Sequence, residues 1–107
     1  MIKATVFRNK NGEICAFKVK NHGKSIVCAA VSVLTVNAVN SVEKFTGEEA
    51  KCSYKEEGGY INFEMPRIMR GFSNEKTSLL MDSFYLGLTG VARDNPESIE
   101  IIVKEVL

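Results

Sequence analysis

The 107-residue sequence has no tryptophan, only two prolines and a single histidine, and it lacks a large excess of either sign of charge. Its 14 lysines and arginines nearly balance 13 aspartates and glutamates, which gives a formal net charge of +1. Proteins that bind nucleic acid mainly through excess charge are strongly basic, so the composition argues against that class. Arg67, Arg70 and Lys76 offer only a loose basic cluster. We therefore expect no direct nucleic-acid partner.

Cysteine is also scarce. The three cysteines, Cys15, Cys28 and Cys52, are odd in number and lack the paired spacing of a zinc site. One histidine cannot complete the usual Cys/His zinc set, and no cofactor motif is visible, so we expect neither a metal nor another cofactor. Cysteines that form no disulfide framework favour the reducing cytoplasm.

Long hydrophobic runs are limited as well. The first residues enter a strand pattern directly, so we expect no signal or transit peptide. The longest apolar-rich run, residues 26–39, is interrupted by Ser32, Thr35 and Asn37 and is too short to cross a bilayer. A hydrophobic content of 45% and a charged content of 25% are ordinary for a soluble globular protein. We expect a cytoplasmic protein without a membrane partner.

The hydrophobic periodicity predicts an α+β fold in the order β-β-α-β-β-α-β, within one domain covering residues 1–107. Two hairpins, each followed by a helix, and a closing strand would form a mixed sheet of about five strands with two helices packed on it. The Asn9–Gly12 turn joins the first two strands. The predicted strands are Ile2–Arg8, Glu13–Lys20, Ala50–Lys55, Tyr60–Met65 and Ser98–Leu107. The predicted helices are Ile26–Phe45 and a second one capped by Ser73 and ending near Ala92, with a connector over Arg67–Phe72 before it.

The first helix has more apolar surface than one sheet face can cover. Its core stripe is Val27, Val31, Leu34, Ala38, Val42 and Phe45. Ile26, Ala29, Val33 and Val36 extend the apolar surface around the side, and a second copy of the chain would bury them, so we expect a homodimer through this helix. In the second helix, Gly87 and Gly90 indicate a close approach to a neighbouring element.

The chemistry concentrates where the second strand leads into the first helix. His22 lies in a polar, glycine-containing stretch, and Cys28 follows six positions later, in the first turn of the predicted helix. A helix start stabilises a thiolate through its N–H groups and partial positive charge, and a nearby histidine can remove the thiol proton. Ser25 is the expected N-cap of this helix. From spacing alone, a buried packing cysteine and an unremarkable loop histidine stay the commoner explanation.

The residues around Cys28 resemble a known family. The sequence GKSIVCAAVS, residues 23–32, is similar to the motif Gly-x-Asp-Ile-Val-Cys-Ala-Ala-Val-Ser of the Prp (YsxB-like) family of ribosomal-processing cysteine proteases. In that family a Gly-His pair ends the second strand, and the motif opens the first helix after an intervening loop. The resemblance extends over the whole chain through residues 1–4, 37–42, 58–60 and 84–88.

The resemblance implies a function and a site. Proteins of this family remove an N-terminal extension from the large-subunit ribosomal protein numbered twenty-seven, so the partner would be that precursor. Cys28 would be the nucleophile and His22 the base. Three departures stand out: Asn21 replaces the glycine before the histidine, Ser25 replaces the aspartate, and the stretch between His22 and Cys28 is shorter than usual in the family. The alternatives are a non-catalytic ribosome-associated binding module and a small dimeric scaffold in which Cys28 only packs.

Overall fold

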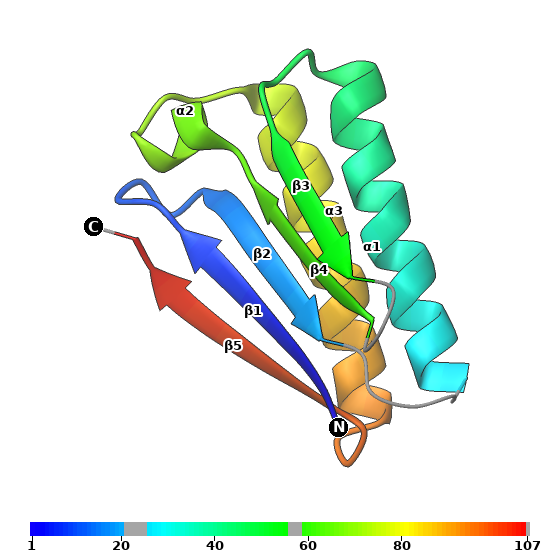
Figure 1. Ribbon diagram of the computed structural model, residues 1–107. Helices are drawn as coiled ribbons and strands as arrows, with labels where there is room; N and C mark the ends of the chain where they lie inside the picture. Colours follow the sequence, from blue (N-terminus) through cyan, green and yellow to red (C-terminus); the bar gives the residue numbers. More distant parts are fainter. Residues whose placement is uncertain (21–25, 56–58, 107) are drawn as a thin grey trace.

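The structure is a computed structural model that describes residues 1–20, 26–55 and 59–106 (Figure 1). Five strands form one mixed sheet in the order β3-β4-β2-β1-β5. Strands β1 and β5 are parallel, whereas the other neighbours are antiparallel. The strands are β1 (Ile2–Arg8), β2 (Ile14–Lys20), β3 (Lys51–Lys55), β4 (Tyr60–Glu64) and β5 (Ile99–Glu105).

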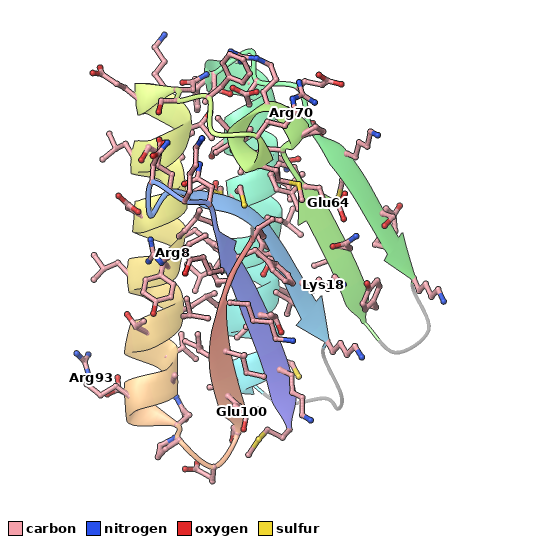
Figure 2. The ribbon with its side chains drawn as sticks, turned by 90° about the vertical axis from the view of Figure 1, so that its left-hand side faces the viewer. Arg8, Lys18, Glu64, Arg70, Arg93 and Glu100 are labelled. Carbon is pink, nitrogen blue, oxygen red and sulfur yellow. The ribbon has the colours of Figure 1, made fainter. Side chains whose placement is uncertain are left out.

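Two long helices, α1 (Ile26–Phe45) and α3 (Glu75–Asp94), lie side by side on one face of this sheet, and a short helix, α2 (Pro66–Met69), follows β4. Figure 2 looks onto the opposite face of the sheet, with both long helices behind it. The predicted α+β fold, with a mixed sheet of five strands and helices packed on it, is confirmed.

The core lies between the sheet and the two long helices. Strand β1 illustrates how the alternation of side chains along a strand produces this core. Ile2, Ala4 and Val6 are buried toward the helices, while Lys3 points to solvent on the other side. At the centre, the Phe17 ring of β2 lies 5.2 Å from the Phe63 ring and 4.5 Å from the Phe84 ring. Each fully buried aromatic side chain contributes about 1.5–3 kcal/mol, so this cluster joins β2, β4 and α3 strongly.

Helix α1 has the predicted bounds, but its buried face differs in part from the predicted stripe. Val27, Val31, Ala38 and Val42 are buried as expected, and Cys28, Thr35 and Val39 join them. Leu34 is half-buried and packs against the core, as expected. Phe45, the last residue of the helix, is exposed, so that core assignment is wrong. Because α1 packs against α3 as well as toward the sheet, its buried face is broader than one stripe.

Helix α1 is longer than the apolar-rich run of residues 26–39. With 20 residues it is long and apolar enough, by length and composition alone, to cross a membrane. The core helix of a soluble protein passes the same test. Val31 and Val42 are completely buried against the rest of the molecule, so we interpret α1 as a core helix.

The connection between β4 and α3 differs from the prediction. Pro66 begins the short helix α2, where its fixed φ suits the first helical position, so the expected connector over Arg67–Phe72 is partly helical. The predicted cap Ser73 is wrong. Asn74 caps α3 by accepting a hydrogen bond from the Thr77 amide at 3.2 Å, while the Ser73 hydroxyl donates to Glu13 at 2.7 Å. The helix therefore begins one residue later than predicted, so the side chain at the capping position is that of Asn74.

A buried carboxylate holds this region together. The Glu48 side chain is fully buried, and both of its oxygens accept hydrogen bonds from Arg67 Nη1, at 3.2 and 3.3 Å. Asn74 Nδ2 donates to the same carboxylate at 3.2 Å. The segment between α1 and β3, helix α2 and the N-cap of α3 therefore share one charge-assisted network. Arg67 belongs to this network, so it does not serve the loose basic cluster considered from the sequence.

Other boundaries shift by a residue or two. Strand β2 begins at Ile14, β3 at Lys51 and β5 at Ile99, while β4 ends at Glu64. The end of the predicted last strand, residue 107, lies outside the described residues, as do the expected Ser25 cap and residues 56–58 of the second hairpin turn. The first hairpin is as predicted, with Gly12 at a φ of 81°.

The two glycines of α3 differ in their surroundings. A Cβ at Gly87 would lie 2.8 Å from Cδ2 of Leu34, so the predicted close approach is confirmed there as a contact with α1. A Cβ at Gly90 would meet no heavy atom within 4 Å, so the same expectation is wrong at that position.

These surroundings give a stability prediction. Gly90→Ala will raise the free energy of unfolding by about 1 kcal/mol, because alanine is the better helix former. Gly87→Ala brings the same gain in helix propensity but displaces Leu34, so it will be less stable than Gly90→Ala by about 1–2 kcal/mol. Urea denaturation of both variants and the parent measures the difference. Equal stabilisation by the two substitutions would contradict the close contact.

Candidate active site

The start of α1 places Cys28. Strand β2 ends at Lys20 and α1 begins at Ile26, and both ends lie at the same end of the molecule (Figure 1). Cys28 is the third residue of α1 and therefore lies in its first turn, as predicted. There the backbone N–H groups point toward the helix start, where the helix dipole presents a partial positive charge. The position suits a side chain that reacts as a thiolate.

Cys28 also lies at the border of the core. It is 8% exposed and belongs to the same hydrophobic cluster as Val27 and Val31. This packing fixes its Cα while a small part of its surface meets solvent. His22, the predicted base, lies outside the described residues, between Lys20 at the end of β2 and Ile26 at the start of α1. The structure thus positions one of the two predicted catalytic residues.

The other two cysteines have different environments. Cys15 is completely buried in β2, and its thiol donates to the Phe7 carbonyl oxygen at 3.4 Å. Burial raises the pKa of the Cys15 thiol. Partial burial also raises the pKa of Cys52, with a further contribution from the negative charge of Glu43. A raised pKa lowers the thiolate fraction at neutral pH, so neither residue has the character of a nucleophile. All three cysteines are described, and none forms a disulfide.

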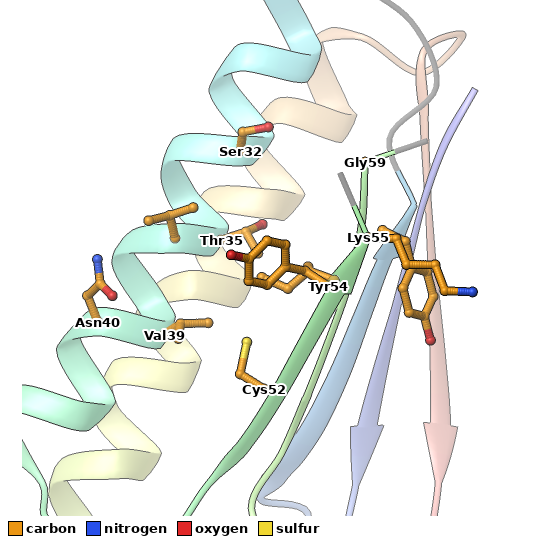
Figure 3. A pocket seen from close by; sticks show the side chains of 11 residues that line it. Ser32, Thr35, Val39, Asn40, Cys52, Tyr54, Lys55 and Gly59 are labelled. Carbon is orange, nitrogen blue, oxygen red and sulfur yellow. The ribbon is translucent and has the colours of Figure 1, made fainter. Parts of the chain in front are cut away.

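An apolar groove lies beside α1. It has a volume of about 420 Å³ and lies between one face of α1 and the strands β3 and β4. Figure 3 shows Thr35 and Val39 of α1 opposite Cys52 and Tyr54 of β3. The other lining residues are Ser32, Val36 and Asn40 of α1, Lys55 of β3, and Gly59, Tyr60 and Ile61 at the start of β4. The groove begins one helical turn after Cys28 and follows α1 away from it.

The groove suits an extended apolar segment. The hydroxyl of Thr35 donates to the Val31 carbonyl at 2.7 Å, so this polar group is satisfied within the helix. From Ser32 to Asn40 the helix advances about 12 Å, which matches about four residues of extended peptide. In the described sheet β3 is an edge strand, so one side of its backbone is not used by a neighbouring strand.

Reasoning from the sequence missed this groove. Its signal is present: small and apolar residues recur on one side of α1, and Cys52 and Tyr54 alternate on β3. Only the packing of α1 against α3 shows that these two surfaces face each other with space between them. Among the residues that the structure describes, no three or more His, Cys, Asp and Glu side chains are grouped to hold a metal ion.

Comparison with known proteins decides the family. The sequence profile of the family described as cysteine protease Prp matches residues 1–100. The chain belongs to the cysteine protease Prp family. It is 30% identical to the ribosomal processing cysteine protease Prp of Bacillus subtilis (strain 168), an alignment that covers 94% of this chain and 96% of that protein. The predicted family and the predicted cysteine protease are confirmed.

Solved structures share the Prp fold. The crystal structure of SMU.848 from Streptococcus mutans is 30% identical, has a TM-score of 0.83, and is matched over 98% of this chain and 95% of that one. The structure of an essential ribosomal processing protease Prp from S. aureus with a covalently linked product peptide is 22% identical, with a TM-score of 0.86, and is matched over 97% of this chain and all of that one. The same S. aureus protease has been solved with a substrate peptide, at 20% identity and a TM-score of 0.84. At these lower identities the likeness establishes the fold.

Proposed function

We propose that this chain is an endopeptidase that removes the N-terminal extension of a ribosomal protein precursor, with Cys28 as nucleophile. The observation that carries the proposal is the position of Cys28: it lies in the first turn of α1, at one end of an apolar groove. A relative with 30% identity is named a ribosomal processing cysteine protease. By family resemblance, the substrate is the large-subunit ribosomal protein numbered twenty-seven.

The proposed mechanism is acyl transfer through a thioester. His22 removes the proton from Cys28, and the thiolate attacks the scissile carbonyl carbon. Backbone N–H groups in the first turn of α1 stabilise the oxyanion of the tetrahedral intermediate. The intermediate collapses, the C–N bond breaks, and the proton on His22 passes to the leaving amine. Water, deprotonated by His22, then hydrolyses the thioester and releases the extension with a free carboxylate.

The groove along α1 and β3 holds the substrate in this proposal. About four residues of an extended N-terminal segment fill it, their apolar side chains packing against Val39 and Tyr54. The unused edge of β3 offers main-chain hydrogen bonds to the same segment. Such a site binds a disordered, apolar extension rather than a folded domain. Residues 1–107 act as one catalytic domain in the cytoplasm, where the precursor is made.

A homodimer through α1 is part of the proposal. On the surface of this helix Ile26 is 87% exposed and Val33 is 69% exposed, although both are large and apolar. A second copy packed on this surface would bury them. The exposed side of α1 adjoins both Cys28 and the groove, so a dimer would leave two active sites close to one interface.

The nucleophile is tested first. With a peptide that spans the extension and the mature start of the ribosomal protein, the parent enzyme will cleave at one bond. Cys28→Ala will lose detectable cleavage, and His22→Ala will lower kcat by about 10²–10⁴-fold, the usual contribution of a general base. Mass spectrometry of the products measures both. Cys15→Ala removes a thiol of β2 that does not line the groove, so it is the matched control and will keep its activity. Cleavage by a folded Cys28→Ala variant would disprove the assignment.

The rate of alkylation gives a control that needs no substrate. In the nucleophile proposal, Cys28 reacts with iodoacetamide faster than Cys52 at pH 7, although Cys28 is buried and Cys52 is exposed. Cys52 serves as the internal comparison, since partial burial and the negative charge of Glu43 raise its pKa and so lower its thiolate fraction. A Cys28 that reacts no faster than Cys52 would favour a binding module, or a scaffold in which Cys28 only packs.

The groove is tested through Tyr54, whose side chain is exposed on the edge strand and lines the groove. Tyr54→Ala will raise KM by about 5- to 30-fold with little change in kcat, because it removes apolar contact made equally in the ground and transition states. Leu86→Ala, an exposed apolar residue of α3 away from the groove, is the control. An unchanged KM in Tyr54→Ala would place the substrate elsewhere.

The dimer is tested by mass in solution. Analytical ultracentrifugation will give twice the chain mass for the parent and for Leu79→Glu, a change of an exposed leucine on α3. Val33→Glu will give the monomer mass, since a charge cannot be buried without a partner in an apolar interface. A monomeric parent would contradict the proposed interface.

A further inference from the structure

The face of the sheet that carries no helix in the described structure has an ordered arrangement of charge. Cross-strand partners point to the same side of a sheet, so the strand register assigns its residues. One row across β5, β1, β2, β4 and β3 is Glu100, Lys3, Lys20, Tyr60 and Lys55. The next is Ile102, Thr5, Lys18, Asn62 and Ser53, and the third is Lys104, Phe7, Ala16, Glu64 and Lys51. We call these three rows the open face. Figure 2 shows Lys18, Glu64 and Glu100 on it.

The open face is strongly positive. Its three rows contain six lysines and two glutamates, whereas the whole chain has a net charge of only +1. The excess on this face is therefore offset by a negative balance over the rest of the molecule. The two ion pairs in the described part of the chain join Arg67 to Glu48 and Arg93 to Asp94, so neither neutralises a lysine of the open face.

The arrangement costs stability in the isolated protein. Lys3 and Lys20 are direct cross-strand partners on β1 and β2, and like charges in this position repel. Lys3, Lys20 and Lys55 share one row, at the end of the sheet where β2 leads toward α1 and Cys28. A polyanion lying along the row would remove the repulsion, because its charges would alternate with the ammonium groups.

The aromatic and aliphatic residues of the open face indicate which class of polyanion it would bind. Phe7 and Tyr60 are half-buried rings among the lysines, and the Lys18 ammonium lies 5.6 Å from the centre of the Phe7 ring. Exposed sheet faces that combine cations with aromatic rings suit single-stranded nucleic acid, whose bases stack while its phosphates pair with the cations. A membrane surface would need apolar side chains that insert into it, whereas the one large aliphatic residue in the three rows, Ile102, is half-buried.

We propose that the open face binds RNA, in an unpaired segment, through its backbone phosphates. This goes beyond the protease activity and replaces the expectation of no nucleic-acid partner, which rested on net charge. Net charge averages over the whole surface, whereas binding depends on the local field. An RNA-bound protease would keep its catalytic end close to the place where ribosomal proteins meet RNA.

The test measures binding of a short, mixed-sequence single-stranded RNA, labelled with a fluorophore, by anisotropy at several salt concentrations. The face variant carries Lys3→Gln, Lys18→Gln and Lys104→Gln. The control variant carries Lys10→Gln, Lys44→Gln and Lys76→Gln, which change the net charge equally at exposed positions outside the three rows. Each lost phosphate contact reduces the slope of log K against log salt by about 0.7.

The expected result is salt-dependent binding by the parent and the control variant. The face variant will bind at least about tenfold more weakly at low salt, with a slope smaller by about 2 for three lost contacts. Absence of binding by the parent, or an equal loss in both variants, would overturn the proposal. Tighter binding to anionic phospholipid vesicles or to polyglutamate than to RNA would overturn it as well.

Peptide cleavage separates this proposal from the proposed function. Lys3, Lys18 and Lys104 do not line the groove, so the face variant will cleave the extension peptide at the parent rate in the absence of RNA. Loss of RNA binding with normal cleavage supports the assignment of the face. Normal RNA binding by a parent protein that cleaves nothing would contradict the protease proposal alone.

Discussion

The one-sided core is the constraint on which the rest of the molecule depends. Phe17 on β2 packs between Phe63 on β4 and Phe84 on α3, which holds the sheet and the helices together from one side. With both long helices on that side, α1 must begin where β2 ends, and its first turn is fixed by the burial of Val27 and Val31. The same constraint leaves the other side of the sheet to solvent. The position of the thiol and the lysine-rich face are two results of one packing arrangement.

Much of the fold could be predicted because its signals are local. The apolar spacing gave both ends of α1, and the Asn9–Gly12 turn gave the first hairpin. Errors arose where a neighbour decides between adjacent residues. Ser73 and Asn74 are both good caps, and Asn74 takes the role because its amide also reaches Glu48 and the Thr46 carbonyl. Gly87 and Gly90 look alike in the sequence, but only Gly87 faces Leu34.

The candidate site was predicted less completely. The place of Cys28 follows from where α1 begins, so it could be foreseen, and the family motif made it specific. The groove depends on the spacing between α1 and β3, two elements that are far apart in the sequence, and no local pattern encodes that distance. The charge of the open face has the same origin. Lys3, Lys20 and Lys55 are scattered along the chain, and only the strand register brings them into one row.

The parallel pairing of β1 with β5 has a consequence for how this molecule is made. The first strand of the sheet finds one of its two neighbours only at residues 99–105, near the far end of the chain. Strand pairings between residues this distant in sequence form slowly, because the entropy cost of closing the long loop comes before the stabilising contact is made. A nascent chain holding only β1 to α3 leaves an edge of β1 uncovered and Ile99 missing from the core. Proteolytic capacity would therefore arise only after residues 99–105 have been synthesised and can pair with β1.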